Sequence, residues 1–159
     1  MAAPTKQALK AELLARLRDD LETLTRAHRA TCEGATHEQA KPENDKDTRA
    51  LEQSYLARGQ AARIEELRAA VAEVSAMPVR ASPESRVALG VLVTLEEEGE
   101  ESTLFLAPAG GGERLAEGQV QVVTPRSPLA RALAGRREGD EVEVLLAGRA
   151  RTLQIVRIA

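Results

Sequence analysis

Apolar positions repeat with a helical period in the first half of the chain and alternate with polar ones in the second half. From about Thr5 to Ala30, residues facing one side recur at spacings of three and four, which is typical of a helix that pairs with another helix. We call this line of inward positions the seam. The seam positions predicted for the first helix are Leu14, Leu17, Leu21, Leu24 and His28, widened near the start by Leu9 and Leu13.

A second helix is predicted from about Asp45 to Ala76, after a loop at residues 35–44. Its seam is apolar near the end of the helix and polar or small nearer the loop. The predicted positions are Ala50, Gln53, Ala57, Gln60, Ile64, Leu67, Val71 and Val74, with Leu51, Tyr55 and Leu56 beside them expected to complete the packing. Two helices of similar length joined by a short loop predict an antiparallel hairpin with arms roughly 40 Å long.

Residues 77–86 contain two prolines and are interpreted as a linker. After it, β-branched and leucine residues alternate with polar ones, which predicts a domain of about five strands and one short helix. A glycine triplet at residues 110–112 is interpreted as a flexible loop. The predicted strands cover 87–95, 103–107, 120–123, 141–146 and 152–158.

The short helix carries its own start and stop signals. Ser127 is suited to cap its first turn, and Pro128 fits the first helical position, where no N–H is needed. Gly135 fits the end of the helix, where a left-handed residue is favoured. Arg131 lies in the last turn, where positive charge suits the helix dipole.

Composition excludes several classes of protein. Aromatic residues make up 1% of 159 residues and charged ones 30%, which suits long exposed helices. A net charge of −3 argues against a general nucleic-acid binder. No apolar run reaches membrane-spanning length and no signal peptide is visible, so a cytoplasmic location is expected. Cys32 is the only cysteine, which excludes a disulfide framework and a zinc set within the chain.

A long ordered motif connects the chain to a known family. The string Thr124-Pro125-x-Ser127-Pro128-Leu129-Ala130-Arg131-Ala132-Leu133-x-Gly135, followed by Gly139-Asp140-Glu141-Val142, resembles the C-terminal domain of the Gre transcript-cleavage factors of bacterial RNA polymerase. The resemblance implies an α+β fold. An antiparallel two-helix coiled coil would cover residues 1–76 with a tip loop near 33–47, the linker 77–86 would follow, and an FKBP-like antiparallel β domain with one short helix would cover 87–159.

The resemblance also implies a function. Members of this family bind RNA polymerase, insert the coiled-coil tip into its secondary channel and stimulate cleavage of backtracked RNA by the polymerase itself. The chain would then be no enzyme in its own right, would reach the RNA 3′ end or DNA only through the polymerase, would contact no membrane and would act as a monomer. The docking residues implied on the β domain are Arg126, Ser127, Pro128, Leu129 and Arg131.

Acidic residues at the tip are the candidates for chemistry. By the resemblance, Glu43, Asp45 and Asp47 would act in cleavage, and Asp45 and Asp47 would share a Mg²⁺ ion in the polymerase centre, with no cofactor bound stably. Magnesium keeps most of its waters, so few protein ligands are needed. The alternative is structural, since acids in a first helical turn favour the dipole and acids in loops are solvated.

Two other functions remain open on the sequence. The family's tip carries acids spaced Asp-x-x-Glu, whereas here Asp45 and Asp47 are two apart, which favours a channel regulator or inhibitor without cleavage activity. An FKBP-like domain also suggests a prolyl isomerase or chaperone, but that activity uses an aromatic-lined pocket and Phe105 is the only aromatic residue of the domain. His28 is interpreted as a packed seam residue, and His37 as a further candidate beside the tip acids.

Overall fold

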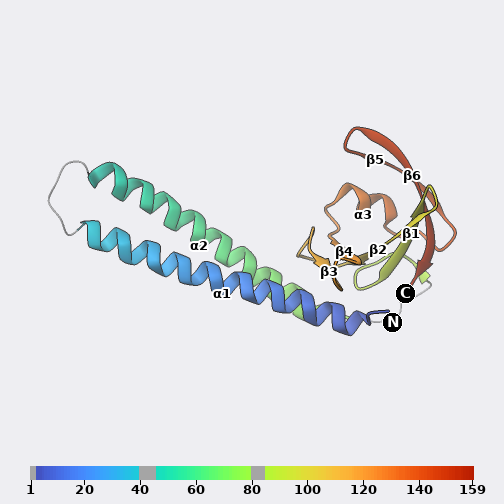
Figure 1. Ribbon diagram of the computed structural model, residues 1–159, viewed down its shortest axis with the longest axis horizontal. Coiled ribbons are helices and arrows are strands. Elements are labelled where there is room, and N and C mark those ends of the chain that lie inside the picture. The colour runs from blue at the N-terminus through green and yellow to red at the C-terminus, as the bar shows by residue number, and fades with distance from the viewer. Residues whose placement is uncertain (1–2, 40–45, 80–84) are drawn as a thin grey trace. The chain divides into compact units, whose positions relative to one another are not determined.

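The computed structural model describes residues 3–39, 46–79 and 85–159, and the side chains of 35–39 and 46–47 are outside that description. Two long helices are followed by six strands and one short helix (Figure 1), which confirms the predicted α+β class. The chain divides into two compact units. Residues 16–71 form one, and residues 1–15 with 72–159 form the other.

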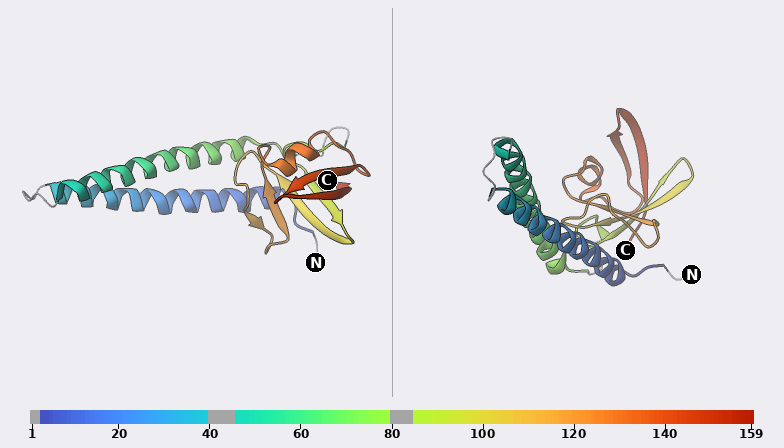
Figure 2. Two further views of the ribbon diagram at one scale, coloured as in Figure 1. Left: turned by 90° about the horizontal axis from the view of Figure 1, so that it is seen from above. Right: turned by 60° about the vertical axis from the view of Figure 1, so that its left-hand side comes forward.

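The two long helices form an antiparallel pair. Helix α1 covers Lys6–Gln39 and α2 covers Lys46–Ala76, and they run beside each other in every view (Figures 1 and 2). The predicted seam is confirmed, because all its positions are buried or half-buried while most of the residues next to them are exposed. We call the end of the pair with the first residues of α1 the base. The buried seam residues near the base include Leu13, Leu17, Ile64, Leu67 and Val74.

The first helix extends further toward the tip than the sequence predicted. Residues 35–39, assigned there to the loop, are helical, whereas α2 begins at Lys46, next to its predicted start. Ala, Glu and Gln are good helix formers, and a single interior glycine costs only about 1 kcal/mol relative to alanine. Gly34 also lies against the other helix, since a Cβ placed on it would be 3.9 Å from the side-chain amide of Gln53.

Three apolar residues beside the α2 seam do not complete the packing, which corrects that expectation. Leu51, Tyr55 and Leu56 are 55%, 61% and 54% exposed. A helix turns by about 100° per residue, so positions next to the seam point away from the partner helix. The guanidinium carbon of Arg58 lies 5.6 Å from the centre of the Tyr55 ring.

The strands form one sheet that curves around the short helix α3, which covers Pro128–Leu133 (Figure 1). The spatial order of the strands is β3-β4-β2-β1-β6-β5. Their bounds are Leu92–Glu97 for β1, Glu100–Leu106 for β2, Arg114–Leu115 for β3, Val120–Val123 for β4, Glu141–Leu146 for β5 and Arg149–Ile158 for β6.

The sheet differs from the predicted antiparallel domain in one pairing and one strand. Strands β2 and β4 are parallel, and every other pairing in the described sheet is antiparallel. A parallel pair needs a long crossover, and residues 107–119, which contain the unpredicted β3, supply it.

The first predicted strand begins later than expected. It starts at Leu92 instead of residue 87, because Gly90 adopts φ +86°. A Cβ on Gly90 would clash with the carbonyl oxygen of Pro78, so glycine is required at this close approach. Val87 and Val91 are nevertheless buried in the core, so they are apolar because they are buried and not because they belong to a strand.

The sheet buries apolar residues on both faces. The inner face, with α3, holds the main core, which includes Val93, Leu104, Leu133, Val144 and Ile155. The outer face carries Phe105, Leu115, Val120 and Val122, all buried. In the same unit, Glu12 Oε2 of α1 accepts a 3.0 Å hydrogen bond from the Ala116 N–H.

The glycine triplet belongs to an ordered turn and not to the flexible loop expected from the sequence. Gly112 N–H donates to Val122 O at 2.9 Å, and Gly110 has φ +82°. A Cβ on Gly110 would lie 2.6 Å from Leu13 Cδ1, so a larger residue would push against the first turns of α1. Leu13 therefore packs beside the β domain as well as within the seam.

Candidate functional site

The N-terminus of α3 is fixed by its cap. Ser127 has the extended backbone of a capping residue, with φ −69° and ψ 147°, and its Oγ accepts a 3.0 Å hydrogen bond from the Ala130 N–H. Pro128 follows at the first helical position, as predicted. Ala130 and Leu133 are buried in the core, so the helix is held both by its cap and by its apolar side.

Replacing Ser127 by alanine should destabilise the β domain by about 1 kcal/mol, because the Ala130 N–H would lose its acceptor. The measurement is the midpoint of urea unfolding at neutral pH. Ser127→Asp is the matched control, since aspartate also caps helices and should retain most of the stability. Equal midpoints for wild type and Ser127→Ala would show that the cap contributes nothing.

A cavity of about 780 Å³ lies on the inner face of the sheet beside this helix start. Its apolar walls come from several strands and from α3, and its polar rim comes from five strands. The apolar residues are Leu95, Leu104, Val123, Leu129, Leu146 and Leu153, and the rim includes Glu97, Glu101, Arg114, Gln121 and Arg151. Its volume lies within the range of ligand-binding pockets, about 300–1,000 Å³.

One side of the rim is an ion pair between β1 and β6. Arg151 Nε donates to Glu97 Oε1 at 2.7 Å and to Oε2 at 3.0 Å, and Arg151 Nη2 also bonds Oε2. These hydrogen bonds lower the pKa of Glu97 below its ordinary value of 4.5, and the positive charge of Arg151 adds to this lowering while desolvation opposes it. The same hydrogen bonds raise the pKa of Arg151.

The pH dependence of stability should report this pair. Because the pKa of Glu97 is lower in the folded protein, its contribution is present above the unfolded pKa and is lost as pH falls through the folded value. Glu97→Gln should therefore lower the unfolding midpoint at pH 7, and the gap to wild type should close at pH 3. Glu141→Gln, at an exposed position of β5, is the control and should show no such gap. A gap for Glu97→Gln that persists unchanged at pH 3 would contradict the assignment.

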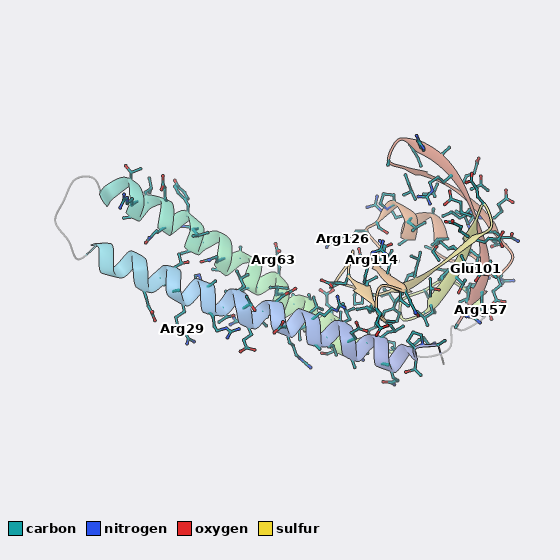
Figure 3. The ribbon with its side chains drawn as sticks, in the orientation of Figure 1. Arg29, Arg63, Glu101, Arg114, Arg126 and Arg157 are labelled. Carbon is teal, nitrogen blue, oxygen red and sulfur yellow. The ribbon has the colours of Figure 1, made fainter. Side chains whose placement is uncertain are left out.

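The structure brings together three of the five predicted docking residues. Ser127, Pro128 and Leu129 line the cavity. Arg126 lines a second, shallower hollow of about 400 Å³ that includes Gly111 and Gly112. Arg131 is exposed in the last turn of α3 and lines neither hollow. Arg126, on the segment before α3, and Arg114, on β3, can be located in Figure 3.

The rim residues were not found by sequence reasoning. Glu97 and Arg151 are 54 residues apart, and only the pairing of β1 with β6 brings them into contact. Arg114 belongs to a strand of two residues, too short for an alternating pattern to reveal, and it pairs in register with Gln121. No alternating pattern marks these residues, since Glu97 lies between Glu96 and Glu98 and Arg151 lies between Ala150 and Thr152.

The role predicted for the tip acids Glu43, Asp45 and Asp47 stays a prediction. Glu43 and Asp45 lie outside the described residues, and Asp47 is in the first turn of α2 with its side chain outside the description. Within the described ranges, no three His, Cys, Asp or Glu side chains gather as metal ligands. His28 Nε2 lies 3.7 Å from the Sγ of Cys32, one turn away on α1. His37 lies in the described helix, but its side chain does not belong to the description.

Comparison with known proteins agrees with this architecture of a helical hairpin and a β domain with a capped short helix. Residues 82–159 match the family model described as "Transcription elongation factor, GreA/GreB, C-term". The chain is 31% identical over 148 residues to transcription elongation factor GreA of Halorhodospira halophila, covering 90% of each. The protein therefore belongs to the GreA/GreB family of transcription elongation factors.

Other relatives cover less of the chain or are more distant. GreA of Brucella canis is 32% identical over 97 residues, or 60% of each chain. The transcription factor Gfh1 matches with 20% identity and a TM-score of 0.41 over 91% of this chain and 92% of its own. GreA/GreB from Nitrosomonas europaea matches with 23% identity and a TM-score of 0.37 over 58% and 78%. No helix in the described part of the chain is long and apolar enough to span a membrane.

Proposed function

We propose that this protein binds bacterial RNA polymerase, inserts the tip of its hairpin into the secondary channel and stimulates cleavage of backtracked RNA. The observation that carries the proposal is family membership across both halves of the chain, because the similarity to a GreA spans 148 residues. The protein would act as a monomer in the cytoplasm and would reach RNA or DNA only through the polymerase.

The hairpin has the dimensions for this role. Helices of 34 and 31 residues rise about 1.5 Å per residue, which makes each arm about 45–50 Å long. A two-helix rod with a continuous seam is narrow along its whole length, so it can enter a channel that excludes a globular domain. Its exposed surface carries charged side chains such as Arg29 on α1 and Arg63 on α2 (Figure 3).

The β domain would dock on the polymerase outside the channel. The cavity beside α3 combines buried leucines with charged groups on its rim, which suits an apolar protruding segment with polar flanks. Ser127, Pro128 and Leu129 would contact that segment, since they line the cavity. Arg126 and Arg131 would contact charged groups around it.

At the tip, Glu43, Asp45 and Asp47 would supply carboxylate oxygens, which are the ligands that Mg²⁺ prefers. When bound, such an ion supplies a water of lowered pKa for attack on the transcript. The residues of this chain would only hold and orient the ion, and the polymerase would carry out the cleavage. The protein would accordingly be a cofactor of the polymerase and not an independent enzyme.

A second candidate function is regulation of the channel without cleavage. Asp45 and Asp47 are separated by one residue, so on a helix their side chains would point about 160° apart. Such a pair binds a single ion less well than acids three or four apart on one face. The protein would then occupy the channel and slow nucleotide addition.

The test is a transcript-cleavage assay on purified polymerase halted with a backtracked RNA. Release of short 3′ fragments should become faster when the protein is added with Mg²⁺. Slower nucleotide addition with no fragment release would support the second function instead. Absence of binding to the polymerase, measured by co-sedimentation at matched salt, would overturn both.

A further inference from the structure

The seam of the hairpin changes character along its length. Toward the base it is filled by Leu17, Ile64 and Leu67, all buried. Toward the tip it carries polar or small side chains instead. These outer seam residues are His28, Thr31, Ala50, Gln53, Ala57 and Gln60, all half-buried.

Three polar atoms of the outer seam are removed from water and have no hydrogen-bond partner among the described residues. They are His28 Nδ1, Gln53 Oε1 and Gln60 Oε1. An unpaired buried polar group weakens the folded state, since it gives up its bonds to water and gains none in return. The outer seam thus combines little apolar contact with a desolvation cost that the base does not carry.

The register of the helices places these groups in successive layers. Gly34 of α1 lies beside the side chain of Gln53 of α2. About two turns from that contact toward the base, an antiparallel pair reaches His28 on one helix and Gln60 on the other. The weakening is therefore concentrated in one segment and is not scattered along the hairpin.

We propose that the outer part of the hairpin, residues 28–34 of α1 with residues 50–60 of α2, is a conformational device in which the two helices separate locally while the base stays paired. Local opening at low free energy is expected where apolar contact is sparse and polar groups are unsatisfied. The device lets residues 28–34 and 50–60 adopt more than one arrangement while the base stays rigid. It does not depend on what the tip acids do.

Hydrogen exchange of the full chain tests the proposal. Amides of residues 28–34 and 50–60 should exchange at least tenfold faster than amides of residues 14–21 and 64–71 in the wild type. The double variant His28→Leu/Gln60→Leu makes one layer apolar with little change in volume, so outer amides should slow about tenfold while base amides change less than twofold. Gln7→Leu, at an exposed position of α1, is the control and should leave the outer amides unchanged.

Two results would overturn the proposal. The first is equal exchange rates for outer and base amides in the wild type. That result is expected if the polar seam residues only fix the register of the two helices and do not promote opening. The second is that the outer amides still exchange fast in the double variant and also in Gln53→Leu, a substitution that makes a different layer of the seam apolar. Light scattering of each variant confirms that slower exchange does not come from self-association.

Discussion

The double variant Asp45→Ala/Asp47→Ala should lose the cleavage stimulation that the wild-type protein gives, with a fall of roughly 100-fold in the rate of fragment release at saturating protein. Two carboxylates would be removed from the tip, while α1, the apolar base of the seam and the β domain keep their contacts. Affinity for the polymerase should therefore change little. The measurement pairs the cleavage rate with an independent binding assay.

Asp19→Ala/Asp20→Ala is the matched control for this prediction. Both residues are exposed on α1, so the same charge is removed from the same hairpin away from its tip. This variant should cleave like the wild type. If both double variants stimulate cleavage equally, Asp45 and Asp47 do not act in the reaction, and Glu43 is the next residue to replace.

Phe105→Ala should destabilise the β domain by about 3–5 kcal/mol, which is a large share of the roughly 5–15 kcal/mol that holds a domain folded. Phe105 is fully buried on the outer face of the sheet. Phe105 lies on β2, where it pairs with Leu92 of β1 on one side and with Val122 of β4 on the other. Removing its ring therefore leaves a cavity over central strands of the sheet. Scanning calorimetry should show a lower transition temperature for the unit that contains the sheet.

Leu145→Ala is the control for that measurement. Leu145 lies on the edge strand β5 and is 67% exposed, so its truncation should change stability by no more than about 0.5 kcal/mol. A change below 1 kcal/mol for Phe105→Ala would contradict the burial of the outer face. Such a result would mean that nothing packs over this side of the sheet in solution.

Local patterns were sufficient for much of the fold. The three-and-four spacing located the seam of both helices, including its polar positions Gln53 and Gln60. The capping chemistry of Ser127 and Pro128 located α3, a run of β-branched residues located β4, and alternation located β5. These predictions succeed because each depends on residues that interact within a few positions along the chain.

Errors arose where a residue's environment depends on distant segments. Leu51 and Tyr55 are apolar, but the partner helix does not reach the side of α2 on which they lie. Val87 alternates like a strand residue, but the close approach of Pro78 to Gly90 delays the strand. In both cases the local pattern identified apolar residues correctly but predicted the wrong structural role for them.

The sequence by itself determined the helical hairpin, the capped short helix and the family motif around it, because short-range periodicity and capping depend on adjacent turns. Only the tertiary structure decided the parallel pairing of β2 with β4, the packing of Leu13 beside Gly110, and the cavity rim that joins Glu97 to Arg151. These features depend on which segments, far apart along the chain, become neighbours. That choice is made by the whole chain as it buries both faces of one sheet, and no local pattern encodes it.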